Sequence, residues 1–203
     1  MELLKIRQVN LGEIVRKAVK FIKKGKVLIC PTDTVYGLIA DAANKKAVEK
    51  LFKIKKRNSG KPVPIFAKDI KMAKKLAVID KEQEKFLKGV WPGKVTVVLK
   101  RPRFRRGFGG RGKIYGIDKK TIGLRIPKYK LINTLLEKVN RPLTGTSANL
   151  SGRPASVKIK EVLKQFKNQK FQPDLIINVG NLPKSRPSKV IDLTCKKEKI
   201  LRK

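Results

Sequence analysis

The sequence predicts an α/β domain whose β-sheet is mixed rather than purely parallel. Short runs rich in β-branched residues alternate with longer segments in which apolar residues recur at helical spacing. The alternation is imperfect, which favours a mixed sheet with flanking helices. The chain has 203 residues, 40% of them hydrophobic, which is enough for one core of ordinary size. We therefore expect a single domain over residues 1–203.

Apolar periodicity and capping residues define the predicted helices. Asn and Asp side chains stand where an N-cap is needed, and a glycine ends the first helix. In chain order, the predicted helices are residues 11–24 closed by Gly25, a helix after the Asn44 cap with its apolar face at residues 47–52, a helix after the Asp69 cap, a helix from the Asp80 cap to Gly89, residues 131–139 and residues 157–166.

Apolar and β-branched runs bounded by Gly, Pro or polar residues define the predicted strands. The first of them is short, reads as buried, and is stopped by Pro31. The strands are expected at residues 27–30, 63–67, 95–99, 122–126, 175–179, 189–193 and 199–201. No internal repeat is visible.

The residue types that are missing exclude several kinds of chemistry. The chain contains no histidine, so a Ser-His-Asp triad, a Cys-His pair and an imidazole metal ligand are excluded. Two cysteines, Cys30 and Cys195, cannot staple a fold of this size. No run of eighteen apolar residues and no signal-peptide pattern is present, and we expect a cytoplasmic protein. Chemistry here must rest on positioning, backbone groups, Lys, Arg, hydroxyls and carboxylates.

The charge balance is strongly basic. Fifty-two Lys and Arg residues against 15 Asp and Glu residues give a formal net charge of +37. A field of this size attracts polyanions and raises their encounter rate. A Lys-rich genome or a salty cytoplasm would account for part of this charge. The charge favours nucleotide or RNA binding without identifying either.

Two polar segments flank the second predicted helix. Residues 31–38, PTDTVYGL, follow a buried strand, where the ligands of α/β sheets collect, although Thr32 and Thr34 could merely cap a turn. Residues 55–57, KKR, end the helix, where cations are favourable in themselves. Lys55 and Arg57 could also point the same way in an extended turn and neutralise charge on a leaving pyrophosphate.

A third polar segment, residues 144–152, reads TGTSANLSG. Its small hydroxyl residues, Asn and glycines let backbone N–H groups approach a phosphate or carboxylate closely. A generic Ser-Gly loop has a similar composition. Each of the three segments is therefore a weak signal alone.

Taken together and in order, these segments resemble the YrdC family of threonylcarbamoyl-AMP synthases from about Lys20 to the end of the chain. The pieces that carry the resemblance are PTDTVYGL at 31–38, KKR at 55–57, WPGKVTVVL at 91–99, GLRIP at 123–127, SANLSG at 147–152, and RPSKVIDL at 186–193 followed by ILR at 200–202. The short, single-domain subtype fits best, because longer relatives carry a second C-terminal domain.

The resemblance implies an open, twisted α/β domain with a large basic concave cleft. It implies an enzyme that joins L-threonine, bicarbonate and ATP into threonylcarbamoyl-AMP and pyrophosphate. This product serves the t6A modification of tRNA position 37, through a downstream threonylcarbamoyl transferase complex. Magnesium is expected to arrive with ATP, since no carboxylate cluster is visible that would hold it alone.

The resemblance also implies roles for individual residues. Catalytic residues that also contact ATP match Lys55, Arg57, Ser147 and Asn149. The threonine site matches Thr32, and Arg125 would hold the amino acid's carboxylate. Further ATP contacts match Ser188 and Arg202. Two departures stand out: many relatives have Ser-Thr where this chain has Ser188-Lys189, and Phe66 lies where certain longer relatives place a histidine.

Two other functions remain open at this point. One is a non-catalytic, basic RNA-binding module on the same fold, acting in tRNA or ribosome maturation. The other is a relative of the hydrogenase-maturation carbamoyltransferases, which the free-standing domain argues against. Residues 101–113, RPRFRRGFGGRGK, favour RNA by charge and stacking, but they could also be a solvated hairpin loop or a lid over ATP.

Overall fold

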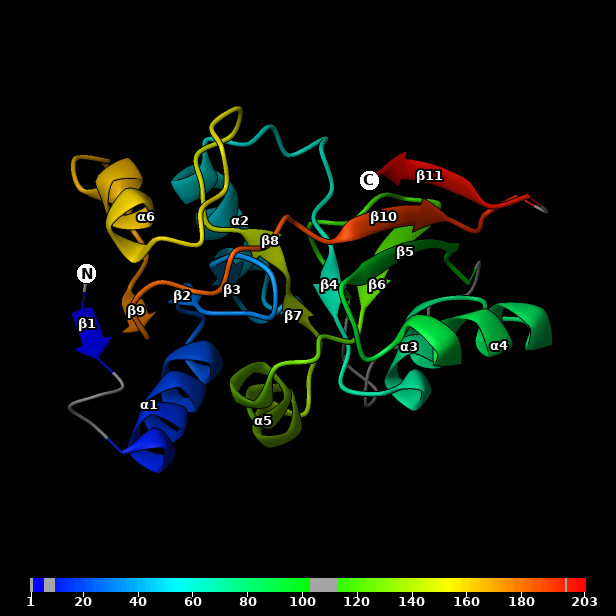
Figure 1. The fold of residues 1–203 in the computed structure, drawn as a ribbon, viewed down its shortest axis with the longest axis horizontal. Helices are drawn as coiled ribbons and strands as arrows, with labels where there is room; N and C mark the ends of the chain where they lie inside the picture. The colour runs from blue at the N-terminus through cyan, green and yellow to red at the C-terminus, as the bar shows by residue number, and fades with distance from the viewer. Residues whose placement is uncertain (1, 6–9, 103–112, 196) are drawn as a thin grey trace.

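The computed structural model describes residues 2–5, 10–102, 113–195 and 197–203 (Figure 1). These residues form six helices and eleven strands, which divide into two mixed sheets. The helices are α1 (Leu11–Lys23), α2 (Lys45–Lys55), α3 (Ile70–Leu76), α4 (Lys81–Val90), α5 (Lys130–Val139) and α6 (Ile159–Phe166). The mixed α/β class that the sequence predicted is confirmed.

The first sheet has the strand order β1-β9-β2-β3-β8, and the second has the order β11-β10-β5-β6-β4-β7. The strands of the first sheet are β1 (Glu2–Lys5), β9 (Leu175–Asn178), β2 (Leu28–Cys30), β3 (Gly37–Ile39) and β8 (Thr146–Ser147). Those of the second are β11 (Lys199–Arg202), β10 (Lys189–Asp192), β5 (Val95–Lys100), β6 (Thr121–Arg125), β4 (Ile65–Phe66) and β7 (Leu143–Thr144). Each sheet contains both parallel and antiparallel pairs.

Helices cover both faces of the first sheet. Ile29 and Leu38 pack on one face with α2 and α6, whereas Leu28 and Ile39 pack on the other with α1 and α5. This division follows from the strand, in which successive side chains point to opposite faces. Figure 1 shows α1 and α5 on one side of this sheet and α2 and α6 on the other. The first sheet is therefore the buried framework of the molecule.

The second sheet buries one face against α3 and α4. Leu124 packs in that core cluster, and its neighbour Arg125 must therefore point to the opposite face. Ile65 and Val97 belong to the same core cluster. Their neighbours Phe66 and Thr96, which are also buried, therefore point to the opposite face as well. The face of the second sheet that carries Phe66, Thr96 and Arg125 consequently turns toward the first sheet.

Gly145 joins the two sheets. The chain leaves the second sheet at β7 and enters the first at β8, with Gly145 as the single residue between them. A Cβ atom at this position would overlap the ring of Phe66. Only glycine lets the backbone pass so close to that ring.

Gly145→Ala should lower the free energy of unfolding by about 1–3 kcal/mol, because Phe66 is buried and cannot swing away without strain. Denaturant unfolding measures this loss. Gly89→Ala in α4 is the matched control, since a Cβ there meets nothing within 4 Å. It should be neutral or stabilising by up to about 1 kcal/mol. Equal stability of the two variants would contradict the close approach at Gly145.

The predicted capping residues are confirmed. The side chains of Asn44, Asp69 and Asp80 accept hydrogen bonds from the backbone N–H of Ala47, Met72 and Gln83, at 3.1, 2.6 and 2.7 Å. The predicted helices and strands agree with the observed ones to within a few residues at their ends. The short strands β1, β3, β7 and β8, of two to four residues each, were not predicted.

Three further expectations concern other parts of the chain. The thiols of Cys30 and Cys195 are free, with Cys30 buried and Cys195 exposed. No helix of the described residues is long and apolar enough to cross a membrane. Residues 103–112 of the predicted arginine-glycine segment lie outside the described residues, so neither the RNA nor the lid hypothesis for that segment is tested.

Candidate active site

A cleft opens between the two sheets, and its walls come from distant parts of the chain. The loop after β2, the end of α2, β4, β6, the segment around β8, the two residues before β10, and β11 all contribute to it. Every residue for which the family resemblance predicted a role lines this cleft: Thr32, Lys55, Arg57, Arg125, Ser147, Asn149, Ser188 and Arg202. Four of the described lining residues are cations and none is an Asp or Glu, so the cleft suits an anionic ligand.

Lys55 ties the end of α2 to the segment at 147–149. Its side chain is buried, and its Nζ donates to the backbone oxygens of Ser147 and Asn149 at 2.6 and 2.9 Å and to Asn149 Oδ1 at 2.9 Å. Burial first, and then the charge of Arg57, lowers the pKa of Lys55 to about 7. The three oxygens match the three protons of an ammonium group, so they favour the charged form that burial disfavours.

Asn149 is the centre of this arrangement. Its Oδ1 also accepts from the hydroxyl of Ser147 at 2.6 Å. Its Nδ2 donates to the backbone oxygens of Leu150 at 3.0 Å and Arg153 at 2.5 Å. Both ends of the amide are therefore used within the protein. The Ser147 hydroxyl, with its proton donated to Asn149, presents lone pairs to the cleft.

Arg57 forms the adjacent wall of the cleft. Its Nε and one terminal nitrogen donate to the backbone oxygens of Lys61 and Pro62, both at 2.9 Å. These bonds fix the plane of the guanidinium group and leave N–H donors that have no partner among the described residues. A fixed, half-buried guanidinium with spare donors is well suited to a phosphate group.

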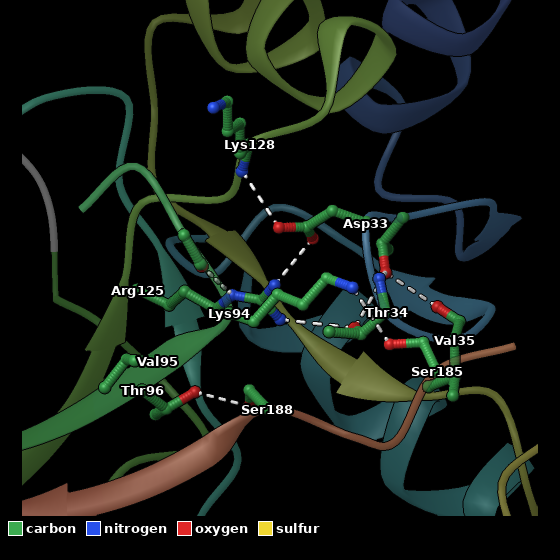
Figure 2. Close-up of polar contacts among 12 residues, drawn as sticks. Asp33, Thr34, Val35, Lys94, Val95, Thr96, Arg125, Lys128, Ser185 and Ser188 are labelled. Atoms are coloured by element: carbon green, nitrogen blue, oxygen red, sulfur yellow. Dashed lines mark hydrogen bonds and ion pairs between the residues drawn. The ribbon is translucent and has the colours of Figure 1, made fainter. Parts of the chain in front are cut away.

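Arg125 lies on the face of β6 that turns to the cleft (Figure 2). It donates to Asp33 Oδ1 at 2.6 Å, to the backbone oxygen of Gly93 at 2.8 Å, and to Thr34 Oγ1 at 3.3 Å. Burial lowers the pKa of Arg125, and the charge of Asp33 opposes that shift. Asp33 also accepts from the backbone N–H of Lys128 at 3.0 Å. Arg125 is thus held rigidly with two of its five N–H groups unused among the described residues.

The hydroxyl of Thr32 both lines the cleft and closes a turn. It donates to the backbone oxygen of Val35 at 2.7 Å and accepts from the backbone N–H of Thr34 at 3.1 Å. The two threonine hydroxyls lie 3.0 Å apart. The turn-capping alternative therefore holds for Thr32, alongside its position in the cleft.

The C-terminal strands complete the far wall. Arg202 donates twice to the backbone oxygen of Ser188, at 2.9 and 2.6 Å, and once to its hydroxyl at 3.2 Å. Ser188 Oγ lies 2.8 Å from Thr96 Oγ1, a contact drawn in Figure 2. These contacts bring the two positions predicted for ATP to one place in the cleft, although Ser188 precedes β10 and Arg202 lies on β11.

The sequence prediction missed Asp33 and Thr96. Asp33 stands inside the PTDTVYGL segment, and its position between two threonines was a usable signal. Thr96 was hidden in a β-branched strand, where a threonine has no distinguishing pattern. Phe66 lines the cleft, and its ring centroid lies 5.7 Å from the guanidinium carbon of Arg125, within reach of a cation–π contact.

The described residues offer no metal-binding cluster. No group of three or more His, Cys, Asp or Glu side chains lies together among them. Asp33, which stands between the cleft residues Thr32 and Thr34, is already engaged by Arg125 and by the backbone N–H of Lys128. The side chains at the cleft therefore do not form a site that would hold a cation without help from a ligand.

The protein is thus of the mixed α/β class, with a cleft between two sheets whose fixed cations and hydroxyls are suited to an anionic ligand. Residues 20–203 match the family model Sua5_yciO_yrdC, which carries the description "Telomere recombination". The chain belongs to this Sua5/YciO/YrdC family.

Three relatives illustrate what the chain is similar to. A threonylcarbamoyl-AMP synthase of Vibrio vulnificus is 31% identical over 190 residues, which cover 92% of this chain and 96% of the relative. The structure of Pyrococcus abyssi Sua5 in complex with L-threonine matches with a TM-score of 0.82 at 31% identity. That match covers 99% of this chain but only 56% of the Sua5 chain. Escherichia coli YciO matches with a TM-score of 0.79 at 28% identity, over 94% of this chain and 89% of that one.

Proposed function

We propose that this protein is an enzyme, an L-threonylcarbamoyladenylate synthase of the nucleotidyltransferase class. It converts L-threonine, bicarbonate and ATP into threonylcarbamoyl-AMP and pyrophosphate. The observation that carries the proposal is the convergence of eight residues from six separate segments on one basic cleft. Relatives named for this activity cover nearly the whole chain, which supports the same assignment.

The chemistry needs little acid–base help from the protein. The free amine of threonine attacks the carbon of bicarbonate, an N–C bond forms, and water leaves, which yields a carbamate. A carbamate oxygen then attacks the α-phosphorus of ATP in line, and the bond to the β-phosphate bridging oxygen breaks to release pyrophosphate. Such a transfer depends on positioning and on charge stabilisation. A chain without histidine is compatible with both steps.

The residues of the cleft divide into two groups in this proposal. Arg57, with its spare guanidinium donors, binds the leaving phosphates, while Ser188 and Arg202 contact the nucleotide. Lys55 and Asn149 position the segment at 147–149, from which Ser147 reaches the substrate. The two unused N–H groups of Arg125 bind the carboxylate of threonine, beside Thr32.

Magnesium and the further partners belong to the same proposal. Because the side chains do not form a cation site, the ion is expected to be held by the phosphates of ATP and to neutralise part of their charge. The adenylate is an activated acyl donor and must be consumed by a transferase. In this proposal that step modifies an adenosine of tRNA, and the enzyme acts in the cytoplasm.

Pyrophosphate release should depend jointly on threonine, bicarbonate and ATP, and omission of any one should reduce it to background. A coupled pyrophosphate assay with each substrate left out in turn measures this dependence. ATP-dependent release without threonine would contradict the proposed substrate. No release under any combination, together with RNA binding, would favour the non-catalytic RNA-binding module that the net charge of +37 also suggests.

A further inference from the structure

A second cavity lies alongside α2, and of the described residues only Arg57 lines both it and the cleft. Its volume is about 480 Å³, within the range of ligand-binding pockets. The apolar part of its lining comes from Val48 and Phe52 of α2 and from Tyr115. Neither the proposed synthesis nor any residue role predicted from the sequence uses this cavity, apart from the shared Arg57.

The rim of the second cavity is positively charged. Lys45, Lys53, Lys56 and Arg57 line it, against one acidic residue, Glu49. Glu49 lies 3.7 Å from Lys45, and both side chains are more than half exposed, so the attraction between the two charges is weak. The remaining cations leave the rim with a net positive charge. An occupant of this cavity should therefore be apolar or aromatic at its centre and anionic at its edge.

The ring of Tyr115 packs against the core cluster that contains Val48 and Phe52, and its backbone is fixed as well. The N–H of Tyr115 donates to the carbonyl of Ala42 at 2.9 Å. The next residue, Gly116, has a φ of 71°, and any Cβ there would press against Val48 and Phe52. The exposed Lys113 places its Nζ over the Tyr115 ring, 5.6 Å from the ring centre. A fixed aromatic ring beside an apolar floor and a neighbouring ammonium group is a suitable platform for a stacked base.

The exposure of the polar groups around the cavity favours a polynucleotide over a free mononucleotide as its ligand. The Lys, Glu49 and Ser59 side chains that line it are exposed. Reading the edge of a single base needs fixed, buried donors and acceptors, and these exposed groups do not provide them. A mononucleotide would therefore bind weakly by stacking, whereas a strand adds several phosphate contacts to the basic rim.

We propose that the second cavity binds one base of a single-stranded polynucleotide, with the flanking phosphates against Lys45 and Lys53. The base stacks on Tyr115 above the apolar floor, and the overall charge of +37 draws the strand to the surface. Stacking and phosphate contacts tolerate any base, so the binding is expected to be independent of sequence. The proposed synthesis of the adenylate requires no polynucleotide, and this inference stands apart from it.

The aromatic contact is tested with a fluorescently labelled RNA of about ten adenosines, by anisotropy on the full chain. Tyr115→Ala should weaken binding by about tenfold or more, while Tyr115→Phe should retain it, because the ring is kept. Thermal melts followed by circular dichroism verify that both variants are folded. Equal binding by folded Tyr115→Ala and the unchanged protein would overturn the proposal.

The charged rim is tested by the salt dependence of the same binding. The double variant Lys45→Gln/Lys53→Gln should reduce the slope of log K against log salt by about 0.7 for each lost phosphate contact. The control pair Lys81→Gln/Lys85→Gln removes two exposed cations from α4, which packs on the second sheet. Equal losses in the two pairs would mean that the net charge alone binds RNA, which overturns the site.

A cleft variant separates this inference from the proposed function. Arg202→Gln removes a cation from the cleft but not from the second cavity. Its affinity for the RNA should change no more than that of the control pair. A loss as large as that of Tyr115→Ala would place the strand in the cleft and overturn the proposal. These assays contain no threonine or bicarbonate, so their outcome is independent of whether the synthesis occurs.

Discussion

Arg57→Ala should reduce pyrophosphate release by about 10²- to 10³-fold at saturating ATP. The guanidinium plane is fixed by the carbonyls of Lys61 and Pro62, and its remaining donors face the cleft. Fixed donors need no reorganisation when charge develops on the leaving pyrophosphate. Loss of the side chain leaves two partly exposed carbonyls that water can satisfy, so the fold should persist. The initial rate of pyrophosphate release, with melting curves as a check on folding, measures the effect.

The matched control for this change lies on α2, the helix that precedes Arg57. Lys46→Ala removes an exposed cation of α2 that lines neither the cleft nor the second cavity. Its rate should equal that of the unchanged enzyme. If Arg57→Ala retains near-normal turnover, Arg57 is a structural residue at a helix end and the assignment to the phosphates is wrong.

Lys55→Ala should abolish product for a different reason. The change removes the donor shared by the carbonyls of Ser147 and Asn149 and the amide oxygen of Asn149. The Ser147 carbonyl keeps the backbone N–H of Asn149 and the amide oxygen keeps the Ser147 hydroxyl, whereas the Asn149 carbonyl loses this buried bond. An unsatisfied buried acceptor costs about 1–3 kcal/mol, so this variant should lose stability as well as activity. Arg57→Ala and Lys55→Ala therefore differ in their melting temperature while both lose turnover. A Lys55→Ala variant as stable as Arg57→Ala would contradict the positioning role of Lys55.

The local elements were predictable because their signals lie within a few residues. Asn44, Asp69 and Asp80 cap helices through bonds to backbone groups three residues away, and such a pattern is visible in a sequence. The seven predicted strands were found by their apolar and β-branched runs. Strands of two residues such as β7 and β8 carry no periodicity, and so their division between two sheets at Gly145 could not be predicted.

The members of the candidate site were predictable from a resemblance, but their contacts were not. Lys55 reaches Asn149 across 94 positions, and Arg125 reaches Asp33 across 92. No local pattern encodes such pairs, because they follow from the packing of the two sheets. The sequence suggested that Lys55 and Arg57 act alike as a phosphate-binding pair, but their contacts in the structure differ. Lys55 is engaged on three sides within the protein, whereas Arg57 keeps free donors.

The second large effect is expected at Arg125, whose substitution should weaken threonine binding, and its design depends on the ion pair with Asp33. The side chains of Arg125 and Asp33 are 3% and 8% exposed, so their charges are desolvated together. Removal of one partner leaves the other buried and uncompensated. Arg125→Ala alone would therefore mix a loss of threonine binding with a loss of stability. A set of three variants separates the two effects.

Arg125→Ala should raise the KM for threonine much more than the KM for ATP, with a loss of roughly 2–5 kcal/mol in threonine binding. Arg125→Lys keeps the charge but has no planar pair of donors, so it should recover stability better than threonine affinity.

Asp33→Asn keeps the shape of the partner and leaves Arg125 in place without its fixed orientation. It should raise the KM for threonine by a smaller factor and leave the KM for ATP unchanged. Calorimetric titration of threonine into the three variants checks these values. Unchanged threonine binding in Arg125→Ala would make Arg125 a purely structural residue, and an equal rise in both KM values would mean that the change distorts the whole cleft.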